Sequence, residues 1–168
     1  MSLIKVNDIQ TTTGTPNRGK VLQVVQITYS SKSTSTGISA FTDSPFGTLT
    51  ITPSSTSSKI LLSTTFGYGI ASSTSCIFRF TRNGTVIGGS GADQNASFGT
   101  GGSGNDSWRE SVSFEYLDSP ATTSALSYKI QFLPFDTSRT VYWNDTPSGG
   151  GVDDATGVTV ITAMEIAA

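Results

Sequence analysis

Short runs in which apolar and polar residues alternate constrain the fold of this chain more than any other feature. In KILLSTTFGYGI (59–70) the apolar residues recur with a period of two, which places them on one face of a strand: Ile60, Leu62, Phe66, Tyr68 and Ile70. Similar runs, or runs rich in β-branched and aromatic residues, predict further strands over 21–30, 47–52, 76–82, 85–87, 111–118, 127–132, 139–145 and 158–166. In the last run, one face carries Val158, Val160, Met164 and Ile166.

Turn-forming sequences separate these runs. Asn83-Gly84 lies between two β-rich segments and predicts a type I′ hairpin, because both central residues of that turn need a positive φ. Ser44-Pro45 and Asp118-Ser119-Pro120 mark two further turns. No segment has a helical period, so the chain reads as roughly eight to ten short antiparallel strands.

Composition supports an all-β fold. Serine and threonine make up roughly three residues in ten, while hydrophobic residues reach 35% and charged residues only 13%. Aromatic residues, at 10%, lie within the periodic runs, which excludes a disordered chain. A chain of 168 residues forms one domain, and we predict an antiparallel β-sandwich of the jelly-roll type over residues 21–168.

Residues 1–20 stand apart from this domain. MSLIKVNDIQ is apolar at Leu3, Ile4, Val6 and Ile9, and the next ten residues are polar and interrupted by glycine and proline. So short a segment cannot bury an apolar face on its own. We therefore expect it to dock on a surface, which belongs to this domain, to a sister chain or to a larger assembly.

Residue types exclude most catalytic and metal sites. The chain has no histidine, the commonest general base, and a single cysteine, Cys76, so an ordinary zinc site is excluded. Cys76 lies within a predicted strand, where a buried hydrophobe is the expected role. The glycine-rich stretch 88–104 lacks the lysine and following helix of a phosphate-binding loop and the spacing of a nucleophile elbow. We expect no cofactor and no catalytic residue.

Acidic residues leave two further alternatives. Asp153-Asp154 and Asp106 with Glu110 are carboxylate pairs of the type that glycosidases use. A calcium site is the other alternative, with oxygen donors from Asp93, Asn95, Asn105 and Asp106. Residues of these types are also ordinary turn formers, so we predict neither a catalytic pair nor a metal site.

Two glycine-rich segments, 88–104 and 144–157, are predicted to be loops on the rim of the sandwich. Both lie near aromatic residues, whose rings suit contact with carbohydrate or protein. The predicted receptor-contact residues are Asp93, Asn95, Asn105, Trp108, Tyr142, Trp143 and Asn144. Core positions for Trp108 and Trp143 are the alternative.

Charge and hydropathy exclude two classes of partner. The net charge of −2 provides no basic surface for nucleic acid, and no run approaches the length of a membrane span. The first ten residues do not have the pattern of a secretory signal.

Several motifs together resemble those of short bacteriophage structural proteins, described as tail-fibre or fibre-like proteins of marine, freshwater and cyanobacterial phages. The motifs are LIKVNDIQTTTG followed by GKVLQVVQ, then ITPSSTSSKILLST, LDSPATTSALSYKIQF and VTVITAMEIAA. The resemblance implies a homotrimeric jelly roll similar to the tumour-necrosis-factor and C1q domains. The strands also carry more aromatic residues than one thin core needs, so some of them are candidates for packing across subunits: Phe66, Phe78, Phe80, Phe114, Phe132 and Phe135.

Two functions follow from this resemblance as expectations. The first is a receptor-binding virion protein, whose N-terminal segment docks on a tail or baseplate protein and whose rim loops contact a host glycan or protein. The second is a cement protein that decorates the major capsid protein, because the chain has no repeat from which to build a fibre shaft. A glycan-degrading enzyme is a remote alternative. All three place the protein on the surface of the phage particle.

Overall fold

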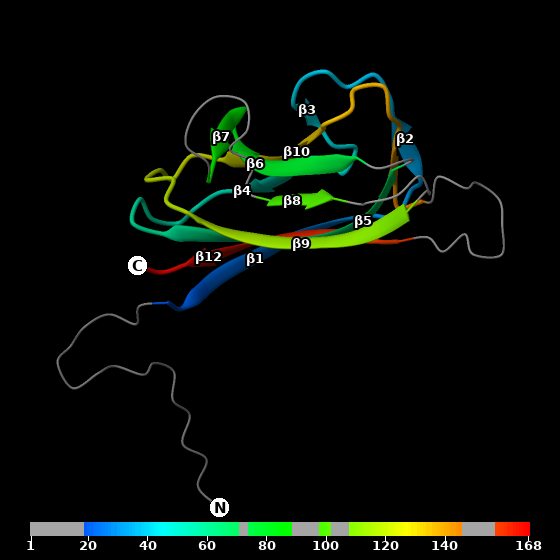
Figure 1. Ribbon diagram of the computed structural model, residues 1–168. Helices are drawn as coiled ribbons and strands as arrows, with labels where there is room; N and C mark the ends of the chain where they lie inside the picture. Colours follow the sequence, from blue (N-terminus) through cyan, green and yellow to red (C-terminus); the bar gives the residue numbers. More distant parts are fainter. Residues whose placement is uncertain (1–18, 71–73, 89–97, 102–107, 146–156) are drawn as a thin grey trace, which may run out of the picture.

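The computed structural model describes residues 19–70, 74–88, 98–101, 108–145 and 157–168, and of residues 98–101, 108 and 109 it describes only the strands that they form. The described residues contain only strands, turns and irregular segments, in two antiparallel sheets that face each other (Figure 1). The predicted all-β sandwich is therefore confirmed.

Sheet A has six strands: β1 (Val21–Tyr29), β2 (Ser33–Ser35), β5 (Lys59–Ile70), β9 (Trp108–Asp118), β11 (Val141–Trp143) and β12 (Thr159–Ile166). Its long strands β1, β5, β9 and β12 form the lower layer in Figure 1, and β2 lies higher, on the right. Sheet B, the upper layer, also has six: β3 (Thr42–Asp43), β4 (Leu49–Ile51), β6 (Ser75–Arg82), β7 (Thr85–Ile87), β8 (Phe98–Gly101) and β10 (Leu126–Pro134).

Several of these strands are collinear halves of one interrupted strand. In sheet A, β11 and β12 pair with successive parts of β5, and β2 and β1 pair with β11 and β12. In sheet B, β7 and β8 pair with successive parts of β6, and β3 and β4 with successive parts of β10. Each sheet thus has four strand positions, in the orders β1/β2–β12/β11–β5–β9 and β3/β4–β10–β6–β7/β8, which is a jelly-roll arrangement.

Aromatic side chains fill the space between the two sheets. The indole of Trp143 contacts the rings of Phe46 and Phe132 edge-on, at centroid distances of 5.0 and 4.6 Å. Five phenylalanines expected to pack across subunits are instead buried inside one chain, which corrects that expectation: Phe66, Phe78, Phe80, Phe114 and Phe132. Two sheets of mostly small Ser and Thr side chains leave room for rings, and edge-to-face pairs fill that room well.

Local sequence signals are confirmed where they are strongest. Asn83 and Gly84 have φ values of 50° and 81° and join β6 to β7, as the type I′ prediction requires. The alternating face of β5 is buried at all five predicted positions. The short strands β2, β3 and β8 were not predicted, because runs of two to four residues rich in Ser, Thr and Gly show no apolar period.

The face predicted for β12 points away from the core. Cross-strand register places Ile161 and Ala163 inward, and both are buried, while Val160 and Met164 lie on the outer face of sheet A and are half-buried. Both faces of this strand thus carry apolar side chains.

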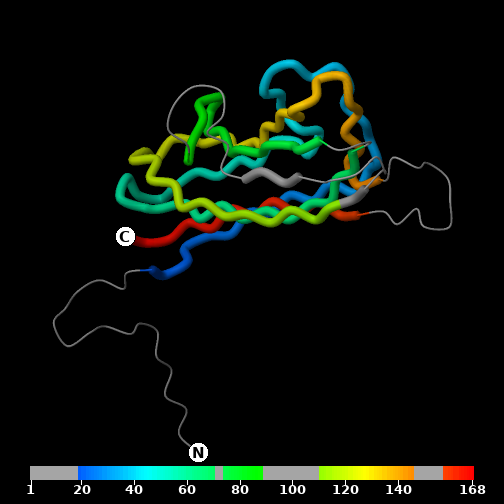
Figure 2. Tube along the Cα trace, viewed as in Figure 1, coloured from blue at the N-terminus to red at the C-terminus, as the bar shows by residue number. Residues whose placement is uncertain are grey.

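The sandwich has two ends, which we name by their residues. At the terminal end, Gly19 N donates to Ala167 O and Ala167 N donates to Lys20 O, and the register of β5 brings Ile60 opposite Asp118. At the far end, Ile70 lies opposite both Trp108 and Val141. The chain trace in Figure 2 shows the C-terminus at the terminal end and the connection from β10 to β11 at the opposite end.

Candidate functional site

The buried carboxylates at the terminal end have structural partners. Arg82 Nη1 donates to both oxygens of Asp118, at 2.7 and 2.8 Å, and Tyr128 Oη donates to Asp118 Oδ2 at 2.7 Å. Burial, followed by the hydrogen bond to Asp118, raises the pKa of Tyr128. This group joins β9 of sheet A to β6 and β10 of sheet B, so its geometry indicates a tie between the layers.

Glu165 is a second buried carboxylate, fully enclosed at the inner face of β12. Ser54 donates to Oε1 from its backbone N at 2.7 Å and from its hydroxyl at 2.6 Å, and Gln23 Nε2 donates to Oε2 at 2.6 Å. Burial alone would raise the pKa of Glu165, but these hydrogen bonds outweigh it and lower the pKa to about 2. Glu165 therefore holds β1 and the β4–β5 connection against β12 as an ionised group.

Within the described parts of the chain, no three His, Cys, Asp or Glu residues lie close enough to hold a metal ion. Glu110, one member of a predicted carboxylate pair, accepts a 3.4 Å hydrogen bond from Tyr68 Oη. Its predicted partner, the second carboxylate pair and the four calcium candidates lie outside the described residues: Asp106, Asp153, Asp154, Asp93, Asn95 and Asn105.

Most residues of the two glycine-rich segments (89–97, 102–107 and 146–156) lie outside the described part of the chain, so their placement on the rim stays a prediction. The stretch 88–104 is not one loop, since β8 interrupts it. Ile87 lies opposite Phe80 and Phe98 lies opposite Phe78, so the chain leaves and rejoins the same edge of β6. On either side of the second segment, Trp143 lies opposite Tyr68 and Val160 lies opposite Thr65, so β11 and β12 share one strand position beside β5. Each segment therefore separates two strands that pair with the same neighbour, which local sequence does not reveal.

Asn144 closes the interrupted strand in sheet A. Its Nδ2 donates to Tyr29 O at 2.9 Å, and its Oδ1 accepts from Thr159 Oγ1 at 3.0 Å. Its backbone N donates to Gly67 O at 3.0 Å, with φ at 53°. Four segments of sheet A therefore meet on this one buried side chain and its backbone.

Two of the predicted receptor-contact residues belong to the interior. Trp143 and Asn144 are 0% and 1% exposed, so neither offers its side chain to a partner, and the core alternative for Trp143 is correct. Tyr142, between them, is half-buried on the outer face of sheet A. Trp108 is the first residue of β9, at the far end. The structure describes its backbone within the strand and not its side chain.

Phe135 is an exposed aromatic residue that the receptor-contact prediction omitted. Its side chain is 61% exposed at the far end, and its backbone N donates to Ser75 O. The next residue, Asp136, accepts hydrogen bonds from Ser138 and Arg139, and these bonds lower its pKa. The turn thus presents Phe135 on an ordered backbone. The sequence could have indicated this exposure, because Phe135 directly follows Pro134 and lies beyond the run of alternating apolar and polar residues in β10.

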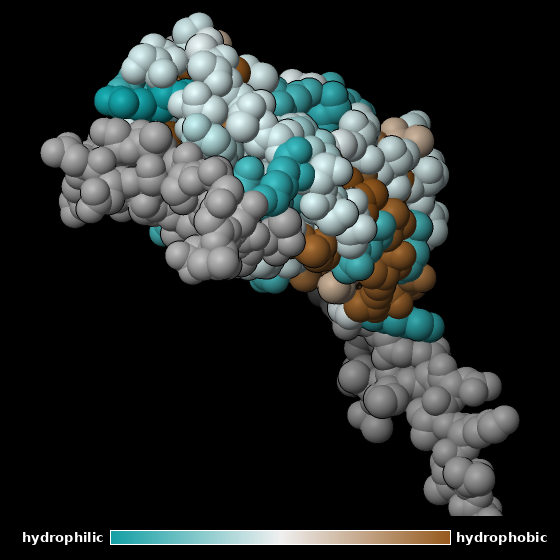
Figure 3. Space-filling model, turned by 90° about the vertical axis from the view of Figure 1, so that its right-hand side faces the viewer, coloured by the Kyte–Doolittle hydropathy of each residue, from teal (hydrophilic) through white to brown (hydrophobic). Residues whose placement is uncertain are grey.

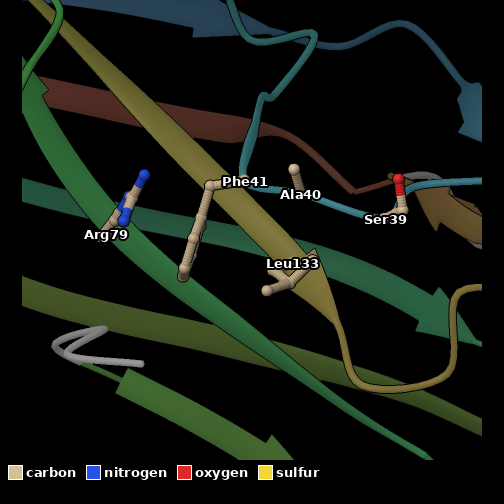
Figure 4. Close-up of a pocket in the computed structure, with 5 residues that line it drawn as sticks. All are labelled: Ser39, Ala40, Phe41, Arg79 and Leu133. Atoms are coloured by element: carbon tan, nitrogen blue, oxygen red, sulfur yellow. The ribbon is translucent and has the colours of Figure 1, made fainter. Parts of the chain in front are cut away.

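The outer face of sheet B carries a shallow groove of about 460 Å³ (Figure 4). Phe41 lies between Leu133 and Arg79, and the Arg79 guanidinium stands 3.5 Å from the Phe41 ring centroid. Nε and Nη2 of Arg79 both donate to Gln131 Oε1. The contact between Arg79 and Phe41 holds the connection between β2 and β3 against the sheet.

The outer face of sheet A carries an apolar row across four strands. Val24 lies opposite Met164, Met164 opposite Leu61, and Leu61 opposite Leu117. Beside this row, Val21 lies opposite Ile166. We call these six residues the outer apolar band. They lie near the terminal end, and Figure 3 shows apolar side chains gathered on the lower part of the molecule, on the side of this face.

The band is not covered by any described segment. Val24, Leu117 and Val21 are 56%, 51% and 48% exposed. The next row on the same face is polar and consists of Gln26, Thr162, Ser63 and Glu115. A hydrogen bond of 3.1 Å joins Gln26 Nε2 to Thr162 Oγ1. This polar row therefore bounds the band on the side of the far end.

Comparison with known proteins leaves the family open. No family model matches the chain, and no curated protein matches it. Among the described residues, no helix is long and apolar enough to cross a membrane. The predicted docking residues Leu3, Ile4, Val6 and Ile9 lie outside the described part of the chain.

Proposed function

We propose that this chain is a non-enzymatic structural protein of a bacteriophage particle. It assembles as a homotrimer, docks on a tail or baseplate protein through residues 1–20, and presents its far end to a glycan or protein of the host surface. Its place is then the surface of the virion.

The polarity of the sandwich carries this proposal. Residues 1–18 join the domain at Gly19, beside Ala167 at the terminal end, next to the outer apolar band. Phe135, which is exposed on an ordered turn, lies at the opposite end. The terminal end thus carries the N-terminal segment and the outer apolar band, which suit attachment to a particle. The far end carries an exposed aromatic side chain, which suits contact with a partner. A protein mounted on a particle needs this separation of roles.

The sheet edges support self-association. Among the described strands, β9 and β1 each pair on one side only. Unpaired edges promote association, and closed symmetry is the usual way in which soluble chains cover them. A trimer also agrees with the resemblance of the sequence to trimeric jelly rolls.

The roles of the buried carboxylates support a structural function over an enzymatic one. Asp118 and Glu165 are both buried, and both accept hydrogen bonds that join strands. A glycosidase needs two carboxylates that face one substrate.

A capsid cement protein is the second candidate. The outer apolar band favours it, because an apolar surface at the attached end can form one part of a larger contact with the major capsid protein. In this case the far end has no ligand, and substitution of Phe135 has no effect on infection.

Immunogold labelling of particles of the virus that encodes the chain tests the proposal. Antibodies raised against the protein are expected to label the tail region of intact particles. Label spread over the head would favour the cement protein. The antibody is first checked on a blot of the purified protein. Absence of label on the particles, together with absence of a band on a blot of denatured virion proteins, would contradict both candidates.

A further inference from the structure

We infer that the outer apolar band is the seat of residues Leu3–Ile9 of the same chain. The inference concerns the free protein and does not depend on attachment to a particle. It assigns an occupant to the apolar surface that the band forms on the outer face of sheet A.

The exposure of the band calls for an occupant. Val24, Leu117 and Val21 are each about half exposed, and they are linked by cross-strand pairs through Met164, Leu61 and Ile166. Single exposed apolar residues are common on protein surfaces, but a contiguous apolar patch usually marks a contact. The Gln26–Thr162 hydrogen bond and Glu115 bound the patch on the side of the far end.

The size of the band fits a short segment better than a second copy. A stable interface between two folded chains takes roughly 20–30 residues on each side. The band has six residues, and a second domain laid over it would also cover the polar row of Gln26, Thr162, Ser63 and Glu115. A segment of seven residues with four apolar side chains covers the band alone.

The point at which the chain enters the domain places this segment within reach. Gly19 and Lys20 pair with Ala167, so the described chain begins next to the start of β1, two residues before Val21. Residues 10–18 span up to about 30 Å when extended. The row from Val24 to Leu117 crosses three strand spacings, or about 14 Å. Gly14, Pro16 and Gly19 supply the turn residues that a reversal of direction requires.

The chemistry of the segment matches its seat. Leu3, Ile4, Val6 and Ile9 provide apolar side chains for the band, whereas Lys5 and Asp8 need to remain in water. Charged side chains flank the band, with Lys59 opposite Ile166 and Glu115 two residues from Leu117. Lys5 and Asp8 therefore find partners of opposite charge at the margins of the seat.

Dye binding by the full-length protein tests whether the segment covers the band. The native chain is expected to bind little of the hydrophobic dye ANS, and the double variant Ile4→Asp/Val6→Asp to bind several-fold more. Adding Leu61→Ser and Leu117→Ser to that variant is expected to remove the gain. The matched control, Thr11→Asp/Thr12→Asp, adds the same charge to the same segment and is expected to behave like the native chain.

Cross-linking decides whose segment occupies the seat. Val6→Cys with Leu61→Cys, joined by a flexible bis-maleimide, is expected to cross-link within one chain, whereas Val6→Cys with Thr137→Cys at the far end is not. Equal dye binding by the native chain and the double Asp variant would overturn the inference, as would absence of dye binding by both. Cross-links formed only between chains would also overturn it, because the occupant would then come from a second copy.

Discussion

The hydroxyl of Thr159 donates to the side-chain oxygen of Asn144 across 3.0 Å and so bridges a gap of 15 residues in the chain. Asn144 directly follows β11, and Thr159 is the first residue of β12. Both strands lie beside β5. This contact joins the end of β11 to the start of β12, and so helps to keep both strands in register beside β5.

Replacement of Asn144 is expected to be among the most destabilising polar substitutions. Asn144→Ala removes hydrogen bonds to Tyr29 and Thr159 and places alanine at a φ of 53°, so we expect the free energy of unfolding to fall by about 2–3 kcal/mol. Asn144→Gly loses the same bonds without the backbone strain, and its loss is expected to be smaller by roughly 1 kcal/mol. Urea unfolding measures both, and a native-like midpoint for Asn144→Ala would contradict the role described.

The Asp118–Arg82 pair gives a prediction with an internal control. Asp118→Asn leaves Arg82 and Tyr128 without their carboxylate at a site where Asp118 is 4% exposed, and the expected loss is about 2–4 kcal/mol. Asp43→Asn breaks an exposed pair with Lys129, whose side chains are 43% and 42% exposed, and should cost less than about 1 kcal/mol. If urea unfolding gave the same loss of unfolding free energy for both variants, burial would not determine how much an ion pair stabilises this protein.

Glu165 predicts a dependence of stability on acid pH. Its pKa in the folded protein, about 2, lies below its ordinary value of 4.5, so the ionised form is favoured by folding. Its contribution is fully present above pH 4.5 and is lost as the pH falls toward 2. Unfolding free energies measured from pH 6 to pH 2 should therefore decline more steeply for the native protein than for Glu165→Gln. Parallel curves would contradict the assignment.

Cys76 is expected to be inert in the folded protein. It is fully buried, and burial raises the pKa of its thiol to about 12, so almost no thiolate forms at neutral pH. A colorimetric thiol reagent should react with one thiol per chain in denaturant and with none in native buffer. Immediate reaction under native conditions would show that this part of the core opens readily.

Local patterns predicted the strands that have strong patterns of their own. Ile60 to Ile70 alternate because β5 is central in sheet A with one face toward the core, and Asn83-Gly84 encodes its turn within two residues. The face of β12 was not predictable in the same way. Ile161 and Met164 are both apolar, and only the pairing with β5 decides which of them points inward.

The candidate site depended on non-local information. Trp143 and Tyr142 are adjacent aromatic residues, but the side chain of Trp143 is buried in the core and that of Tyr142 is half-buried on the outer face. The pairing of β11 with β5 decides which of the two points inward. The glycine-rich segments resemble rim loops in sequence, but register shows that the two ends of each return to the same neighbour. The outer apolar band likewise joins residues from four strands that are far apart in the chain.

Thiol labelling on assembled particles tests the central claim, the polarity of the mounted protein, most directly. Thr56 and Thr137 are exposed residues at the terminal end and at the far end, and cysteine is placed at one or the other. Both variants should react with a maleimide dye as free proteins. On intact particles, Thr137→Cys should still be labelled and Thr56→Cys should be protected. Protection of Thr137→Cys with free labelling of Thr56→Cys, or equal labelling of the two, would contradict the account.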